Sequence, residues 1–205
     1  MTSLYEKYVV PRLIDCLCSM KPMQRLRARY VSGARGEVLE MGIGSGLNLQ
    51  HYGPEVAKIT GVDPAADLTK RAQKRAAEIT APVEVMGISG EALPCEDASF
   101  DTVVCTWTLC SIPDPAPAVK EMRRVLKPGG KLIFVEHGLS DEARIQKWQH
   151  RIEPYWKPMA GGCHLTRRAD TLLKEGGFSL DSFESGHEKG PKFAAFMMHG
   201  VASAA

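Results

Sequence analysis

Three glycines directly after a short apolar run constrain this chain more than any other feature. The run Glu37–Met41 is typical of a buried strand, and Gly42, Gly44 and Gly46 follow at once. Glycine adopts positive φ and has no Cβ, so a ligand can approach the backbone of such a loop closely. We expect a helix to begin near Leu47, with its amide dipoles facing the same loop. Strand, glycine loop and helix form the nucleotide-binding first turn of a doubly wound α/β fold.

Downstream of residue 36 the apolar pattern alternates between strands and helices. We expect strands over residues 38–41, 58–62, 83–86, 100–106, 131–136, 178–183 and 193–201. We expect helices over residues 65–79, 116–126 and 141–151 and from Thr166 to Gly176, and irregular chain over residues 89–99 and 153–165. This alternation predicts a doubly wound, Rossmann-like α/β fold with a seven-stranded sheet, mostly parallel with an antiparallel C-terminal strand.

The length of 205 residues fits a single domain over 1–205. Apolar residues at helical spacing fill residues 4–20, and Pro11 kinks or divides that helix. A second helix restarts at Lys21 and carries Arg25, Arg27 and Arg29, either as a solvated face or as a surface for anions. The helices of residues 1–35 have no place in the sheet, so we expect them to form a lid over the cofactor. Residues 36–137 then form the cofactor-binding core, and residues 138–205 form a substrate-side insertion with the C-terminal strands.

Composition and charge exclude several classes of protein. The formal net charge is +2 without a strong basic stripe, which argues against nucleic acid as a partner. No apolar run approaches the ~20 residues that span a bilayer, and no signal peptide is apparent. The six cysteines lack the spacing of a zinc site, so we expect no metal, reduced thiols and a cytoplasmic location. Peripheral membrane contact and the oligomeric state stay open.

The residues around the glycine loop indicate which nucleotide it binds. A dinucleotide fingerprint needs a third glycine where this chain has Leu47, so that motif fails. The observed Gly-x-Gly-x-Gly is preceded by Glu40, and Asp63 lies 23 residues further on, at the end of the second expected strand. A carboxylate in that place accepts hydrogen bonds from ribose hydroxyls.

Several segments between residues 36 and 137 resemble motifs of class I S-adenosylmethionine-dependent methyltransferases. They are Val-Leu-Glu-Met-Gly-Ile-Gly-Ser-Gly, Gly-Val-Asp-Pro, Gly-Glu-Ala-Leu-Pro, Ser-Phe-Asp-Thr-Val-Val-Cys and Arg-Arg-Val-Leu-Lys-Pro-Gly-Gly. The resemblance implies S-adenosyl-L-methionine as cofactor and S-adenosyl-L-homocysteine as product. It places Glu40 near the amino group of the cofactor, Asp63 at its ribose, and Ser89, where many members have Asp, beside the adenine. The residues implied to bind the cofactor are Glu40, Gly42, Gly44, Gly46, Asn48, Asp63, Pro64, Ser89, Gly90, Glu91 and Thr106.

A narrower resemblance extends to about residue 170. Val-Val-Cys-Thr-Trp-Thr-Leu-Cys-Ser-Ile, Val-Glu-His and Gly-Cys-His-Leu-Thr-Arg are similar to motifs of the alkyl thiol methyltransferases of the methyltransferase-like group. The likeness also extends to bacterial phosphatidylethanolamine and quinone methyltransferases. This chain departs from the animal thiol enzymes because their long apolar N-terminal segment is missing.

Residues that follow the fourth and fifth expected strands are best placed to meet a methyl acceptor, because sites in open α/β sheets lie beyond the carboxyl ends of the strands. His137 is the first candidate for a general base and His164 the second, since a thiol attacks as its thiolate. Both histidines have a purely structural alternative, and Cys110 has one as a packed thiol. The candidate substrate residues are Tyr5, Tyr8, Trp107, Cys110 and Trp156.

Four functions follow from these features, and the first is favoured. The favoured function is S-methylation of a small thiol or sulfide. The alternatives are N-methylation of a phospholipid ethanolamine headgroup, suggested by the basic segment 21–35, and a cofactor-binding regulator without catalysis. A nicotinamide oxidoreductase is the weakest alternative, because the dinucleotide fingerprint fails.

Overall fold

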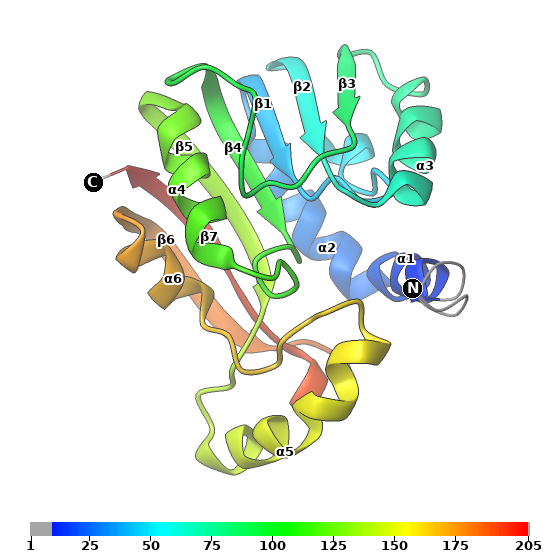
Figure 1. Cartoon of the computed structure of the whole chain (residues 1–205), viewed down its shortest axis with the longest axis vertical. Helices are drawn as coiled ribbons and strands as arrows, with labels where there is room; N and C mark the ends of the chain where they lie inside the picture. Colours follow the sequence, from blue (N-terminus) through cyan, green and yellow to red (C-terminus); the bar gives the residue numbers. More distant parts are fainter. Residues whose placement is uncertain (1–9, 205) are drawn as a thin grey trace.

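A single seven-stranded sheet forms the centre of the computed structural model, which describes residues 10–204 (Figure 1). The strands are β1 (Gly36–Met41), β2 (Val56–Val62), β3 (Val83–Met86), β4 (Phe100–Thr106), β5 (Leu126–His137), β6 (Phe178–His187) and β7 (Phe196–Ala204). Their order is β3-β2-β1-β4-β5-β7-β6, with β1 to β5 parallel and β7 antiparallel to both of its neighbours. The predicted fold class is therefore confirmed.

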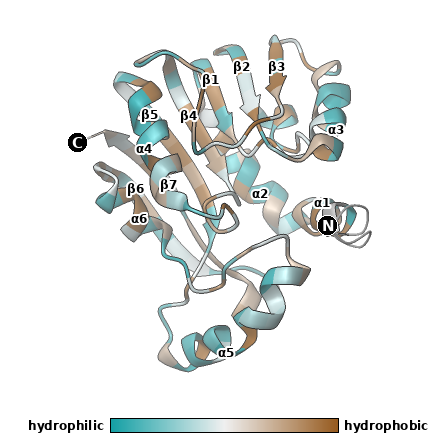
Figure 2. Cartoon of the chain, viewed as in Figure 1, coloured by the Kyte–Doolittle hydropathy of each residue, from teal (hydrophilic) through white to brown (hydrophobic). Residues whose placement is uncertain are grey.

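Helices cover both faces of the sheet. They are α1 (Val10–Cys18), α2 (Lys21–Tyr30), α3 (Ala66–Ala76), α4 (Pro115–Val125), α5 (Ala143–Met159) and α6 (Ala169–Glu175), with 3₁₀ turns η2 (Val31–Gly33), η3 (Leu49–His51) and η4 (Lys192–Ala194). Successive strand residues point to opposite faces, so Leu39 and Val103 pack with α4 and α6, whereas Val38 and Val104 pack with η2, η3 and α3. The central strands are accordingly hydrophobic on both faces, while the helices expose hydrophilic residues (Figure 2).

The apolar runs located the strands closely. β3 and β4 begin and end where expected, and the expected cap of α4 is present, because Asp114 Oδ1 accepts a hydrogen bond from the Ala116 amide at 3.1 Å. The second strand begins two residues earlier than expected, at Val56. β5 also begins earlier, at Leu126, because the Pro-Gly-Gly segment that ends α4 continues directly into the strand with a register shift against β4.

The helix expected near Leu47 is absent. In residues 42–55, all within the described range, the only helical segment is the 3₁₀ turn Leu49–His51. Gly53-Pro54 follows after a few residues, and proline disfavours helical backbone in the residue before it. The Asn48 side chain is also engaged with buried partners rather than with a helix cap. The dipole of a long helix therefore does not face the glycine loop.

The chain after β5 is more helical than predicted. α5 is one helix of 17 residues that includes Pro154 and Pro158, so the expectation of irregular chain from residue 153 was wrong over its first half. Both prolines are exposed, and the carbonyl groups they leave without a helical partner can bond to water. Thr166 does not cap α6, because its hydroxyl donates to the Glu153 carboxylate of α5; Arg168 is the residue before that helix.

Gln149 fastens α5 to the sheet. Its side chain is 0% exposed, and its Oε1 accepts a hydrogen bond from the Ser140 amide at 2.9 Å. Its Nε2 donates to the carbonyls of Gly138 at 3.0 Å and Phe193 at 3.1 Å. One side chain thus satisfies three backbone groups from the end of β5 and from η4, in a place that water does not reach.

Replacing this amide tests its structural role. Gln149→Leu keeps the volume but leaves three buried backbone groups unpaired, so we expect a loss of about 2–4 kcal/mol in the free energy of unfolding. Urea denaturation followed by circular dichroism measures the change. His150→Ala, on the exposed side of the same helix, is the matched control and should stay within about 0.5 kcal/mol of the parent. Equal stability of the Leu variant and the parent would contradict the assigned role.

Candidate active site

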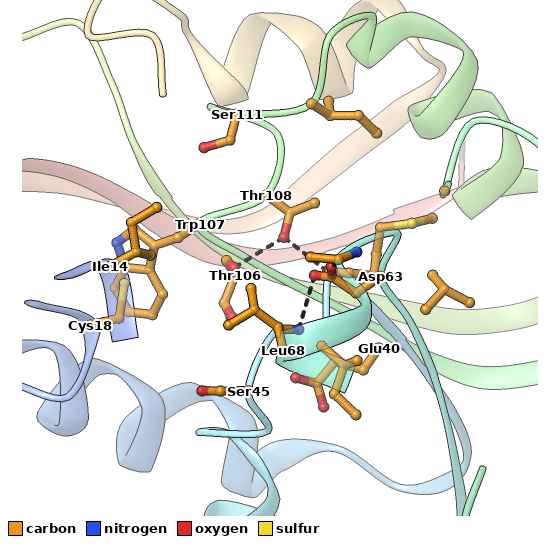
Figure 3. A pocket seen from close by; sticks show the side chains of 18 of the residues that line it. Ile14, Cys18, Glu40, Ser45, Asp63, Leu68, Thr106, Trp107, Thr108 and Ser111 are labelled. Atoms are coloured by element: carbon orange, nitrogen blue, oxygen red, sulfur yellow. Dashed lines mark hydrogen bonds between the residues drawn. The ribbon is translucent and has the colours of Figure 1, made fainter. Parts of the chain in front are cut away.

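A cavity of about 330 Å³ lies at the carboxyl ends of β1, β2 and β4 (Figure 3). Of the predicted cofactor residues, it is lined by Glu40, Gly42, Gly44, Asn48, Asp63, Pro64, Ser89, Gly90 and Thr106. Of the predicted substrate residues within the described range, Trp107 alone lines it, and Tyr5 and Tyr8 lie outside the described residues. Gly46, Glu91, Cys110, Trp156 and both candidate histidines are not part of its wall.

Each of the three positions in the loop requires glycine for a different structural reason. All have positive φ, at +73° for Gly42, +53° for Gly44 and +80° for Gly46. A Cβ at Gly42 would collide with Thr108, and one at Gly46 would press on Leu49 and on α3. A Cβ at Gly44 would instead enter open space, with Gly42 O at 4.0 Å as its nearest neighbour. Gly44 is therefore the glycine whose missing side chain leaves room inside the cavity.

Asp63 closes the glycine loop at the end of β2. Its Oδ2 accepts a hydrogen bond from the Gly44 amide at 3.1 Å, and its Oδ1 accepts one from the Ala65 amide at 2.8 Å. Burial raises the pKa of this carboxyl, and the two amide bonds oppose that rise by favouring its ionised form. The carboxylate thus lies on the cavity wall in a position where it can accept further hydrogen bonds.

Glu40 is the second carboxylate of the wall and is almost completely buried, at 1% exposure. It accepts hydrogen bonds from Asn48 Nδ2 at 2.9 Å and from the Tyr52 hydroxyl at 2.8 Å. Burial raises the pKa of Glu40 to about 7, although both bonds act in the opposite direction. A cation that enters the cavity next to Glu40 would favour the ionised carboxylate.

Arg27 of α2 is a wall residue that the sequence analysis did not single out. Its guanidinium donates to Asn48 Oδ1 at 2.9 Å and to the Cys18 carbonyl at 2.7 Å, and it lies over the Trp107 ring with 4.3 Å to the centroid. Arg25 and Arg29 are exposed, so the solvated-face interpretation holds for them but not for Arg27. The helical spacing could have indicated that Arg27 is buried, because position 27 falls on the inward stripe of Leu26 and Tyr30.

Glu136 shapes the loop that follows β4. Its carboxylate is fully buried and accepts hydrogen bonds from the amides of Thr108, Leu109 and Cys110, at 2.9, 3.0 and 3.0 Å. Burial raises its pKa to about 7 against these donors. Trp107, directly before them, has a φ of +51°, which is costly for an aromatic residue and persists only because its surroundings fix it.

The described part of the N-terminal region borders the cavity through α1. Ile14, Asp15 and Cys18 line it, and Figure 3 shows Ile14 and Cys18 beside Trp107. Asp15 accepts a hydrogen bond from the hydroxyl of Ser45 in the glycine loop and forms ion pairs with two arginines of α3, Arg71 at 3.2 Å and Arg75 at 3.5 Å. The helix is thus held against both the loop and α3, in the position that a lid requires.

Three remaining candidates, His137, Cys110 and Trp156, form a separate cluster around Cys163. His137 Nδ1 lies 3.2 Å from Cys163 Sγ, and its Nε2 has no hydrogen-bond partner in the described part of the chain. A hydrogen bond with Cys110 lowers the pKa of the Cys163 thiol well below its usual range, and the His137 ring adds to that effect. Trp156 packs beside His137 with 6.3 Å between ring centroids. Gly161, two residues before Cys163, connects this cluster to the cavity wall.

His164 and Glu91 have other partners. His164 Nδ1 lies 3.1 Å from Glu153 Oε1, and its amide donates to the Cys110 carbonyl at 2.7 Å. The Glu91 carboxylate accepts bonds from the Ser89 hydroxyl at 2.9 Å and the Asp114 amide at 3.1 Å. Glu91 therefore orients Ser89, which does line the cavity.

These features fit S-adenosylmethionine. The cavity provides open space over Gly44, a carboxylate at the end of β2 and a buried carboxylate at Glu40. Across residues 10–204 no group of three or more His, Cys, Asp or Glu side chains could hold a metal ion. In the same range, no helix combines the length and apolar character needed to cross a bilayer.

Known methyltransferases are similar to this chain in sequence. Residues 39–134 match the family model described as a methyltransferase domain. The chain is 37% identical over 155 residues to thiol S-methyltransferase TMT1B of Rattus norvegicus, covering 73% of this chain and 63% of that protein. It is 35% identical over 135 residues to phosphatidylethanolamine N-methyltransferase of Cereibacter sphaeroides, covering 63% of this chain and 66% of that protein.

A solved structure extends the likeness to the fold. The crystal structure of a SAM-dependent methyltransferase from Methanosarcina mazei superposes with a TM-score of 0.64 and 25% identity, covering 82% of this chain and 92% of that one. The chain spans slightly less than two thirds of the length of the two relatives named above. Sequence and fold agree that it belongs to the class I S-adenosylmethionine-dependent methyltransferases, in the group that includes these thiol and phosphatidylethanolamine enzymes.

Proposed function

We propose that this chain transfers the methyl group of S-adenosylmethionine to a small thiol or sulfide. The observation that carries the proposal is one buried guanidinium on the wall of a cavity that also has apolar lining residues. Ile14, Trp107 and Ile112 line it, and Arg27 is the only basic residue among the described lining residues. A thiol attacks as its thiolate, and a nearby fixed cation favours that form.

Within this proposal the cofactor supplies an already activated methyl group, so the chain mainly orients the reactants and excludes water. Asp63 accepts hydrogen bonds from the ribose hydroxyls, and Glu40 faces the amino group of the methionine part. The backbone at Gly42, Gly44 and Gly46 lies along that part. Ser89, Gly90 and Glu91 flank the adenine, while Asn48, Pro64 and Thr106 complete the wall. The α1 helix covers the site as a lid.

The proton of the acceptor thiol passes, in this proposal, toward His137. Support comes from its buried Nε2, which has no hydrogen-bond partner among the described residues. The cavity-lining Gly161 also lies two residues before Cys163, whose Sγ is 3.2 Å from His137 Nδ1. Cys110 and Trp156 shape the route between the histidine and the cavity. His164 is the second candidate, but its ring is engaged with Glu153.

N-methylation of a phospholipid headgroup is the second candidate, and the likeness to the Cereibacter sphaeroides enzyme favours it. The basic segment 21–35 offers it less support than the sequence suggested. Arg27 is buried, Arg29 pairs with Glu184 and Arg35 pairs with Glu55 at 3.4 Å. We also propose a cytoplasmic location, which the six free cysteines support.

Release of S-adenosylhomocysteine across a panel of acceptors tests the function. We expect short alkyl thiols to raise turnover well above the rate without acceptor, in buffer free of detergent and vesicles. Ethanolamine phospholipid vesicles and quinols serve as competing acceptors. Turnover with ethanolamine vesicles alone would establish the second candidate instead. If no acceptor raises the rate, the chain binds the cofactor without catalysis.

Substituting His137 tests the proton route. His137→Gln should lower kcat for alkyl thiols by about 10²-fold or more, the usual contribution of a general base. Aromatic thiols, which are already ionised at neutral pH, should lose much less, and the dissociation constant of the cofactor should not change. His164→Gln is the matched control. An equal loss for both thiol classes would assign His137 to structure.

The pH dependence of cofactor binding tests Glu40. Its pKa of about 7 leaves it largely protonated at low pH, and the cofactor's amino group favours the ionised form, so binding releases a proton. The dissociation constant should therefore fall as pH rises, by up to roughly tenfold per unit below about pH 7, and then level off. Calorimetry in two buffers of different ionisation enthalpy measures the released proton. Glu40→Gln should remove the dependence and the exposed Asp67→Ala should retain it, whereas a flat profile for the parent chain refutes the assignment.

A further inference from the structure

One face of α5 exposes large apolar side chains that the cavity and the core do not use. Trp148 is 51% exposed, Tyr155 74% and Met159 56%. They recur at spacings of seven and four residues, so they share one face of the helix. Arg144 and Arg151 fall on the same face, and all five side chains are exposed. We call this set, Arg144, Trp148, Arg151, Tyr155 and Met159, the α5 outer face.

The charged side chains of the α5 outer face are all positive. Arg151 lies over the Trp148 ring at 5.8 Å, and the exposed Lys147 and Lys157 add two cations beside the stripe. The acidic groups nearest in the chain are engaged elsewhere. Glu153 points inward to His164 and Thr166. Of the two acidic residues before the helix, Asp141 pairs with Arg168, and Glu142 pairs with His187 at 3.6 Å and Lys192 at 3.9 Å. No carboxylate of α5 therefore neutralises these cations.

The inner side of the helix is bonded to the core, and the chain just after it reaches the cavity. Its inner side is fixed by Gln149 and Glu153 and by Trp156, which packs edge-on to Phe193 at 6.1 Å. Gly161, two residues beyond the end of α5, lines the cavity, and so do Ile14 and Cys18 of α1. Leu13 and Leu17 of α1 are 41% and 46% exposed, and Met20, between α1 and α2, is 51% exposed. Exposed apolar side chains thus occur on α1, which lines the cavity, and on α5, which ends two residues before the lining residue Gly161.

We propose that the α5 outer face docks on the surface of an anionic lipid bilayer. Tryptophan and tyrosine favour the level of the lipid headgroups, where the ring is in apolar surroundings and its polar atom stays in water. Arginine and lysine beside them attract anionic headgroups while their stems cover apolar surface. Helices of this composition lie in the plane of the interface without crossing it. Docking brings the mouth of the cavity next to the membrane, where apolar acceptors concentrate. This inference does not depend on which acceptor is methylated.

Vesicle binding by the full chain tests the proposal. We expect co-sedimentation with vesicles of mixed phosphatidylglycerol and phosphatidylcholine, weakening as salt rises, and little binding to phosphatidylcholine alone. Arg144→Gln with Arg151→Gln should lower the partition coefficient by about 30-fold, the effect of two surface cations. Trp148→Ala with Tyr155→Ala should lower binding to the same anionic vesicles. Turnover of a short thiol without vesicles should stay unchanged in both double variants, because none of these residues lines the cavity.

Matched controls separate the face from general charge and hydrophobicity. Lys120→Gln with Lys174→Gln removes two exposed cations from α4 and α6, and Phe183→Ala removes an exposed aromatic ring from β6. These variants should bind anionic vesicles like the parent chain. Absence of binding at low salt, or equal losses in the control variants, would overturn the proposal. So would self-association that depends on Trp148 and Tyr155 without any vesicle binding, since the face would then contact protein.

Discussion

The buried carboxylate of Glu136 fixes the geometry on which both halves of the site depend. It accepts hydrogen bonds from the amides of three successive residues after β4, and two of these residues, Leu109 and Cys110, are buried, so their amides would otherwise be unpaired. Holding them together turns the chain sharply at Trp107, which adopts a left-handed conformation and presents its ring to Arg27. The same turn places Thr108 against Gly42, whose missing Cβ gives the Thr108 hydroxyl its space. One carboxylate therefore sets the spacing between the loop after β4 and the glycine loop.

A second polar network joins the N-terminal helices to this frame. Asn48 donates to Glu40 and Thr106 and accepts from Arg27, so β1, β4 and α2 meet at a single amide group. A buried network of this kind is favourable only when all of its members are satisfied. Docking of α2 therefore completes the site, and α1 is carried into place through the bond from Arg27 to the Cys18 carbonyl. The N-terminal helices and the cavity wall are consequently joined by one hydrogen-bond network.

Features that depend on residues close together in the sequence were predicted well, and features that depend on residues far apart were not. Strands such as β3 and β4 were located well, because a buried strand is a local apolar run. The prediction of a helix after the glycine loop was wrong. The Asn48 side chain bonds to distant partners, and Gly53-Pro54 follows too soon for a longer helix. The predicted α5 was too short. The helix continues through its prolines because they face solvent, and the inward side chain of Gln149 bonds the helix to the chain after β5. The sequence placed Arg27 only in a basic run with Arg25 and Arg29, because charge patterning treats an arginine as exposed, whereas two of its partners lie 21 and 80 residues away.

The cavity wall also has one part built from residues close together in the sequence and another built from distant segments. The cofactor end consists mainly of backbone conformations and strand-end carboxylates, which contiguous motifs encode, and the family match over residues 39–134 covers it. The rest of the cavity wall is assembled from α1, α2, the loop after β4 and the chain after α5, and no single motif contains it. These segments also contact the glycine loop or the residues next to it, through Asp15 to Ser45, Arg27 to Asn48 and Thr108 against Gly42. The wall around Arg27 and Trp107 therefore depends on long-range packing, not on the motifs that identify the family.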